Sequence, residues 1–132
     1  MELALRSAGA AVEEVDYLNL HGTSTPQNDR VETAAVKALL GGRFRSVPTS
    51  ATKSMIGHPQ GASGAAGVVA TLLAMRHSLL PPTVNFERPD PECDLNYIPN
   101  VALERQVDVA LCNCIGFGSK NSALVIARGE RS

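Results

Sequence analysis

The sequence predicts an α/β fold in which helices pack on a mixed β-sheet that closes with an antiparallel hairpin. Short apolar runs alternate with longer stretches that repeat apolar residues at helical spacing, which is typical of parallel βαβ units. Two strand-like segments near the end of the chain are separated by the turn GFGSK, which favours a hairpin. The 132 residues, 44% of them hydrophobic, suffice for one ordinary domain.

A helix and then a buried strand are predicted first. Residues 2–7 favour a helix through leucine and alanine, and Gly9 suits its C-terminal cap. Residues 15–20 form a short apolar run between acidic residues and Gly22, which indicates a buried strand of a parallel sheet. His21 therefore lies just past the C-terminal end of a strand.

A second helix is predicted from about residue 28 to residue 40. Pro26 can open it, because a missing N–H costs nothing in the first turn, and the pair Gly41–Gly42 can end it. We expect its core-facing stripe to consist of Val31, Ala34, Ala35, Ala38 and Leu39. We expect three acidic residues to be surface or capping charges: Asp16, Asp29 and Glu32.

The next strand is expected at residues 47–51, and a third helix at residues 61–77. This helix carries apolar residues nearly all round, which predicts a buried helix. Its first half, GASGAAG, has poor helix propensity, so packing or a ligand must favour it.

The last part of the chain combines an irregular segment with a hairpin. Residues 80–100 hold five of the eight prolines, which predicts an ordered excursion without regular structure. Residues 107–115 and 121–127 are predicted to be the two strands of the closing hairpin.

Composition excludes several classes of function. The formal net charge is −1 and charges of both signs are interleaved, so no nucleic-acid or anionic-membrane surface is expected. No window approaches the roughly 18 apolar residues of a membrane span, and the N-terminal stretch lacks the layout of a signal peptide, so we expect a cytoplasmic protein. The three cysteines form no CxxC pair, which favours reduced thiols.

Three residues stand at junctions where ligands commonly bind in open α/β sheets: His21, His58 and Phe117. His21 alternatively bonds a nearby carbonyl while Ser24 or Thr25 caps the next helix. His58 is equally compatible with an ordinary loop histidine, and Lys53 with a solvated charge.

Metal and phosphate sites find little support in the spacing. A zinc site from His21, His58 and a cysteine would lack any HxxxH, CxxC or HxE motif, so no metal is predicted. The run GASGAAG could cradle a phosphate at a helix start, but it is neither a P-loop nor a dinucleotide fingerprint.

Three segments in this order, HGTSTPQND, KSMIGHPQGASGAAG and CNCIGFGSKN, resemble the C-terminal part of the β-ketoacyl-acyl carrier protein synthases, members of the thiolase-like superfamily. The proline-rich PPTVNFERPDPECDLNYIPN is also similar to a passage of that family, and the similarity extends to about Arg128. The resemblance implies that residues 1–132 are the C-terminal domain of such a synthase and form an incomplete C-terminal half of a thiolase-like fold.

The resemblance also implies a reaction and a set of residues. Members of the family are acyltransferases of fatty-acid or polyketide biosynthesis. They perform a decarboxylative Claisen condensation of a malonyl group with an acyl thioester. The malonyl group is carried on the phosphopantetheine of acyl carrier protein. His21 and His58 match the histidines that meet the enolate oxygen, and Lys53 matches the family's motif lysine. The remaining matches contact the carrier arm (Thr23 and Thr25) or gate the acyl pocket (Phe117 with Gly116 and Gly118). No bound cofactor is implied.

The main departure from the family is the absence of its nucleophilic cysteine, which belongs to the N-terminal half. We expect Cys93, Cys112 and Cys114 to have packing roles. The chain is therefore interpreted as a fragment or one part of a split enzyme that is inactive alone. One expected partner is acyl carrier protein. The other is either the missing cysteine-bearing N-terminal half or a partner subunit in a homodimer or heterodimer.

Two other interpretations remain open. The chain could be a non-catalytic partner subunit, such as a chain-length factor or a scaffolding half-synthase, or a truncated inactive remnant. Gly67 is typical of modular polyketide members, whereas PPTVNF and CDLNYIPN favour the fatty-acid type, so the branch also stays open.

Overall fold

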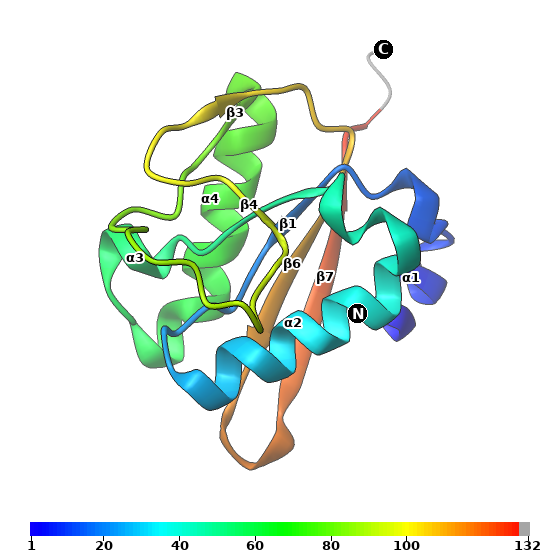
Figure 1. Cartoon of the computed structure of the whole chain (residues 1–132). Helices are drawn as coiled ribbons and strands as arrows, with labels where there is room; N and C mark the ends of the chain where they lie inside the picture. The colour runs from blue at the N-terminus through cyan, green and yellow to red at the C-terminus, as the bar shows by residue number, and fades with distance from the viewer. Residues whose placement is uncertain (130–132) are drawn as a thin grey trace.

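A five-stranded sheet organises the computed structural model, which describes residues 1–129 (Figure 1). The strand order is β4-β2-β1-β6-β7. All neighbouring pairs are parallel except β6 and β7, which form the antiparallel hairpin. The strands span Tyr17–Asn19 (β1), Pro48–Ser50 (β2), Asn96–Tyr97 (β4), Val109–Ile115 (β6) and Asn121–Ala127 (β7). The predicted α/β fold with a mixed sheet and a closing hairpin is confirmed.

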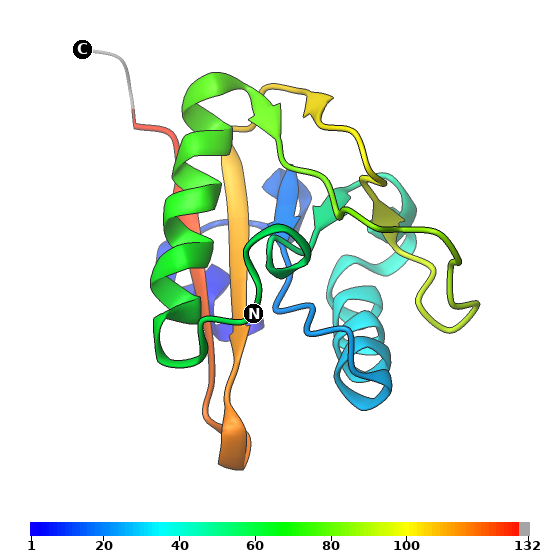
Figure 2. The ribbon, with the colours of Figure 1, turned by 90° about the vertical axis from the view of Figure 1, so that its left-hand side faces the viewer.

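Helices cover both faces of this sheet. The α-helices span Glu2–Ala8 (α1), Pro26–Leu40 (α2), Lys53–Ile56 (α3) and Ser63–His77 (α4). Short 3₁₀ segments occupy Val12–Glu14 (η1), Gly41–Arg45 (η2), Gln60–Ala62 (η3) and Phe117–Ser119 (η4). Figure 2 shows α4 (green) and α2 (cyan) on opposite sides of the sheet. No helix of residues 1–129 has the length and hydropathy that a membrane crossing requires.

Each face of the sheet has its own core, and β1 contributes to both. Leu18 packs in a cluster with Val36 and Leu40 of α2, whereas Tyr17 packs with Ala74 and Met75 of α4. Side chains alternate between the faces of a strand, so Asn19 lies on the α4 side, where its amide donates to α4. The same alternation directs His21, two residues later, toward that side.

The core-facing stripe predicted for α2 is wrong. Glu32, Thr33, Val36 and Leu40 are the buried residues of α2, whereas Val31 is 60% exposed. Glu32 and Thr33 can lie on the inner face because both have hydrogen-bond partners there. Glu32 accepts from backbone N–H groups after β1, and Thr33 is hydrogen-bonded to the hydroxyl of Tyr97. The expectation that Glu32 is a surface or capping charge is also wrong, because it is buried and accepts from backbone N–H groups outside its own helix.

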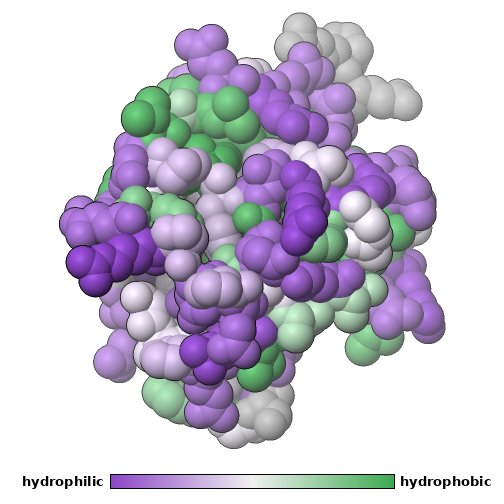
Figure 3. All heavy atoms as spheres, in the orientation of Figure 1, coloured by the Kyte–Doolittle hydropathy of each residue, from purple (hydrophilic) through white to green (hydrophobic). Residues whose placement is uncertain are grey.

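The prediction that α4 is buried all round is wrong as well. Thr71, Ala74 and Met75 are buried, but the opposite flank is open: Val69, Leu72 and Leu73 are 56%, 50% and 50% exposed. Figure 3, seen from the side of α2, shows other hydrophobic residues gathered at the upper left, in front of the C-terminal end of α4. Apolar periodicity alone does not tell which flank a neighbour covers.

The proline-rich segment contains more regular structure than expected. Its strand β4 forms one edge of the sheet, and a small second sheet pairs Leu79–Leu80 (β3) with Leu103–Glu104 (β5). Two-residue strands are too short to produce a sequence period. The segment is tied to α2 and η2 by ion pairs of Arg30, Lys37 and Arg45 with Asp90, Glu92 and Asp94.

Close packing of α4 on β6 gives a test of the fold through two glycines of one helix. A Cβ at Gly67 would lie 2.9 Å from the Sγ of Cys112, whereas one at Gly64 would lie 4.0 Å from the Sγ of Cys114. We expect Gly67→Ala to lower the free energy of unfolding by about 1–2 kcal/mol through overpacking. Gly64→Ala should be neutral or stabilising, because alanine favours helix.

Urea denaturation of both variants measures the difference. Cys112→Ala in the Gly67→Ala background should recover most of the loss relative to Cys112→Ala alone. Equal stability of the two glycine variants would contradict the packing described.

Candidate active site

The backbone of His21 is held from two sides at the end of β1. Its N–H donates to Oε1 of Glu32 at 2.7 Å, and its carbonyl accepts a hydrogen bond from Nζ of Lys53 at 2.6 Å. The N–H of Gly22 donates to Oε2 of Glu32 at 2.9 Å. Gly22 has a φ of +43°, and a Cβ there would lie 2.4 Å from that of Ala51, so this turn requires glycine.

Glu32 is a residue of the candidate site that the sequence analysis missed. It is 2% exposed, and its Oε1 also accepts a hydrogen bond from Nδ2 of Asn113 on β6 at 2.6 Å. Three donors, two just after β1 and one on β6, therefore converge on one carboxylate. Its spacing is a signal that could have found it. Glu32 follows Thr25, the N-cap of α2, by two helical turns, so it lies on the face of α2 that is next to the end of β1.

His58 reaches the same place from the loop between α3 and η3. Its ring centroid lies 5.5 Å from that of His21, with an interplanar angle of 83°. His21 is 4% exposed, whereas His58 is exposed to solvent. The Nδ1 of His58 is hydrogen-bonded to the N–H of Gln60 and to the Oγ of Ser63, each at 3.0 Å. The structure thus brings together the two histidines singled out in the sequence.

A buried polar network fixes the spacing between β1 and α4 beneath this pair. Nδ2 of Asn19 donates to the carbonyl of Gly67 at 3.0 Å and to Oγ1 of Thr71 at 3.1 Å. Its Oδ1 accepts from Oγ1 of Thr52 at 3.4 Å. Asn19 is two residues before His21, so the strand that carries His21 is registered against the helix that follows His58.

Burial controls the protonation of the site. It lowers the pKa of His21 to about 4, with the nearby charges of Lys53 and His58 adding to the effect. His21 is therefore a neutral imidazole at neutral pH. Its Nδ1 is buried and has no hydrogen-bond partner within residues 1–129. Burial also lowers the pKa of Lys53, and the charge of Glu32 partly opposes this shift.

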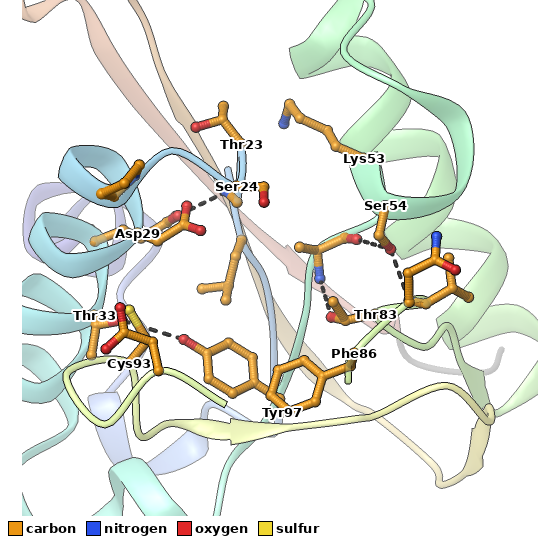
Figure 4. A pocket seen from close by; sticks show the side chains of 18 of the residues that line it. Thr23, Ser24, Asp29, Thr33, Lys53, Ser54, Thr83, Phe86, Cys93 and Tyr97 are labelled. Atoms are coloured by element: carbon orange, nitrogen blue, oxygen red, sulfur yellow. Dashed lines mark hydrogen bonds between the residues drawn. The ribbon is translucent and has the colours of Figure 1, made fainter. Parts of the chain in front are cut away.

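A cleft of about 950 Å³ opens beside His58 (Figure 4), and His21 is not among the residues that line it. Thr23, Lys53 and His58 line it, and so do Phe86 and Tyr97, whose rings lie 5.5 Å apart. Figure 4 shows Thr23 and Lys53 at one end of the cleft and Phe86 and Tyr97 at the other. The Oγ1 of Thr23 is 3.0 Å from that of Thr25, which precedes α2. The cleft therefore joins the candidate polar residues to an aromatic wall.

Three other candidate residues lie at the tip of the β6–β7 hairpin. Phe117 is 98% exposed there and is not among the residues that line the cleft. Gly116 is required by the turn, because a Cβ would lie 2.7 Å from the carbonyl oxygen of Lys120. Gly118 has a φ of +67°. The turn thus accounts for both glycines, and the gating role stays a prediction.

The three cysteines are free thiols. Burial raises the pKa of Cys93 and of Cys112, which keeps both thiols protonated at neutral pH. Cys112 is 5% exposed and packs beneath Gly67, as expected of a packing residue. Within residues 1–129, no group of three or more His, Cys, Asp or Glu side chains is placed to hold a metal ion.

Comparison with known proteins identifies the family to which this chain belongs. The family described as "Beta-ketoacyl synthase, C-terminal domain" matches residues 1–87. The tetracenomycin polyketide synthase ketoacyl synthase alpha subunit of Streptomyces glaucescens is 52% identical over 98% of this chain. A 3-oxoacyl-[acyl-carrier-protein] synthase 2 of Coxiella burnetii is 47% identical over 97% of it. The chain spans about 30% of the length of these relatives.

Solved structures agree with this fold. One described as the ishigamide ketosynthase/chain length factor superposes with a TM-score of 0.93 at 39% identity, covering 98% of this chain and 32% of that one. Another, described as a type II polyketide synthase acyl-carrier protein in complex with its ketosynthase, gives a TM-score of 0.95 at 36% identity over 98% of this chain and 32% of that one.

The lowered pKa of His21 predicts a specific pH dependence of stability. Unfolded His21 binds a proton near pH 6.5, whereas folded His21 does so only near pH 4. Between these values the unfolded state holds more protons, so the free energy of unfolding falls as the pH drops from 6.5 toward 4, by as much as about 3 kcal/mol from this residue.

Chemical denaturation from pH 7 to pH 4 measures this slope. His21→Gln should flatten it, whereas His77→Gln, at the exposed end of α4, should leave it unchanged. Parallel curves for wild type and His21→Gln would show that burial does not hold His21 neutral.

Proposed function

Since this chain belongs to the β-ketoacyl synthase family as its C-terminal domain, we propose that it supplies the two histidines of a decarboxylative condensation. In this reaction a malonyl thioester on acyl carrier protein loses carbon dioxide, and the resulting enolate attacks an acyl thioester. The observation that carries the proposal is the approach of His21 and His58, with ring centroids 5.5 Å apart at the end of a central strand.

The chemistry requires fixed donors at one oxygen. When the bond to the carboxylate breaks, its electron pair moves into an enolate whose negative charge rests on the thioester oxygen. Preorganised N–H groups aimed at that oxygen stabilise the transition state more than the ground state. An imidazole ring can offer one N–H to such an oxygen without giving up its proton.

The protonation state of His21 and the hydrogen bonds of His58 support this role. Burial keeps His21 neutral at neutral pH, so it does not form an ion pair with the enolate but donates a hydrogen bond. His58 accepts the N–H of Gln60 at Nδ1, which leaves the ring proton of the neutral form on Nε2. Lys53, bonded to the carbonyl of His21, places a cationic group next to the site.

The acyl group requires a nucleophile, which we place outside this chain. Cys93 and Cys112 are held as protonated thiols, and neither reacts readily in that form. We assign the acyl-bearing cysteine to a further segment or subunit, in keeping with relatives about three times as long. The exposed flank of α4, formed by Val69, Leu72 and Leu73, is the apolar surface on which that segment would pack.

The carrier arm would enter along the cleft. Thr23 lines the cleft beside Lys53 and shares a hydrogen bond with Thr25, so both hydroxyls can bond the amides of phosphopantetheine. Phe117, projecting from the hairpin, would gate the acyl chain, with Gly116 and Gly118 giving its backbone freedom to move. The structural neighbour described as a carrier protein in complex with its ketosynthase supports such a partner.

A non-catalytic role as a partner subunit is the second candidate. It is favoured by a structural neighbour described as a ketosynthase/chain length factor. The pairing of two imidazoles favours the catalytic role instead, since a scaffold has no need of a buried neutral histidine beside an exposed one.

Reconstitution tests the proposal. The purified chain is mixed with a cysteine-bearing N-terminal half of a β-ketoacyl synthase, and release of carbon dioxide from malonyl-acyl carrier protein is measured. Loss of donors at the enolate should lower the rate at least about a hundredfold in His21→Ala and in His58→Ala. His77→Ala, the third histidine, should match wild type.

Each outcome separates the candidates. A stable complex that releases no carbon dioxide would favour the partner-subunit role. Release that survives both histidine substitutions would overturn the assigned chemistry.

A further inference from the structure

The ring of His58 has an anchor that the proposed chemistry does not yet use, the hydroxyl of Ser63. Oγ of Ser63 lies 3.0 Å from Nδ1 of His58. Ser63 is the first residue of α4 and is 5% exposed, whereas His58 stands in an exposed loop. The helix start that the sequence marks as poor in propensity thus places a buried hydroxyl against a ring of the site.

The other contact of the ring comes from a less regular element. The N–H of Gln60 also lies 3.0 Å from Nδ1, but Gln60 sits in the three-residue turn η3 with a φ of +44°. Such left-handed backbone is costly for a residue with a side chain. By contrast, Ser63 belongs to a helix of 15 residues whose Ala74 and Met75 pack in the core. Ser63 therefore belongs to the more regular of the two elements.

Both groups can bond Nδ1 only in one arrangement of protons. A backbone N–H can only donate, so Nδ1 must carry a lone pair while Gln60 is bonded to it. The hydroxyl of Ser63 then points its proton to the same lone pair, and the two donors share it. The proton of the neutral ring then resides on Nε2.

From this arrangement we propose that Ser63 is a positioning residue, which holds the ring of His58 in its Nε2–H form and in a fixed orientation beside His21. The inference rests on the proposed function, because it concerns how His58 presents its donor. A donor that is misplaced or that visits the other tautomer loses its contribution to the transition state. Ser63 therefore acts on the reaction only through His58.

Three substitutions separate the hydroxyl from the shape of the side chain. Ser63→Thr keeps the hydroxyl, Ser63→Val has nearly the shape of threonine without it, and Ser63→Ala removes it without added bulk. Threonine and valine carry the same number of side-chain heavy atoms, so any packing strain at this buried position is common to that pair. The comparison of threonine with valine thus remains informative even if both lose some stability.

Nuclear magnetic resonance of the chain labelled with ¹⁵N-histidine gives a readout that does not depend on activity. Wild type and Ser63→Thr should show His58 as the Nε2–H tautomer with a strongly hydrogen-bonded Nδ1. In Ser63→Ala and Ser63→Val the Nδ1 resonance should move toward that of a free acceptor, and the ring signals should broaden. His77 serves as an internal control in the same spectra.

The kinetic readout uses the reconstituted enzyme. Ser63→Ala and Ser63→Val should lower kcat for carbon dioxide release by about three- to tenfold, the worth of one hydrogen bond, while KM for malonyl-acyl carrier protein stays the same. Ser63→Thr should keep kcat near wild type.

The two measurements distinguish failure of the positioning role from failure of the proposed function. Ring signals of His58 that are identical in wild type, Ser63→Ala and Ser63→Val would overturn the positioning role whatever the kinetics. Ring signals that change as expected, together with undiminished release by His58→Ala, would overturn the proposed function and the catalytic consequence of Ser63, although the contact itself would stand.

Discussion

The carboxylate of Glu32 is the interaction on which the geometry of the site depends. It joins α2 to the end of β1 through the N–H groups of His21 and Gly22, and to β6 through the amide of Asn113. Glu32 is only 2% exposed, so these donors replace the water that would otherwise solvate its oxygens. Removal of a partner would leave a buried polar group without a hydrogen bond, which is costly. Lys53 closes the arrangement by donating to the carbonyl of His21, so opposite charges hold one residue by its backbone.

This clamp holds the backbone of His21 and does not engage its imidazole. Its Nδ1 has no partner within the described part of the chain, and burial keeps the ring neutral at neutral pH. His58 is held in a different way, through its ring, by Gln60 and Ser63. One histidine is therefore fixed by its main chain and the other by its side chain. The network of Asn19 with Gly67 and Thr71 sets the distance between the two supporting elements.

Local signals in the sequence were sufficient for the helix ends and the hairpin. Gly9 is left-handed after α1, Pro26 opens α2, and β6 pairs with β7 across the predicted turn. Glu32 could not be assigned in the same way, because its partner Asn113 is 81 residues away and a charge on a helix is usually solvated.

The open flank of α4 could not be predicted either, since the sequence does not show whether a neighbour covers an apolar residue. The two histidines were found through motif resemblance, while their approach to 5.5 Å follows from strand order, which no single motif contains.

Direct contact between the two rings, and its dependence on Glu32, is the most immediate test of this account. Nuclear Overhauser effects between ring protons of His21 and His58 would be measured in the wild-type chain and in Glu32→Gln. The account predicts cross-peaks in wild type that weaken or vanish in Glu32→Gln, while the amide signals of the β6–β7 hairpin away from Asn113 keep their positions. Absence of ring contacts in the folded wild-type chain, or equal contacts in both proteins, would contradict it.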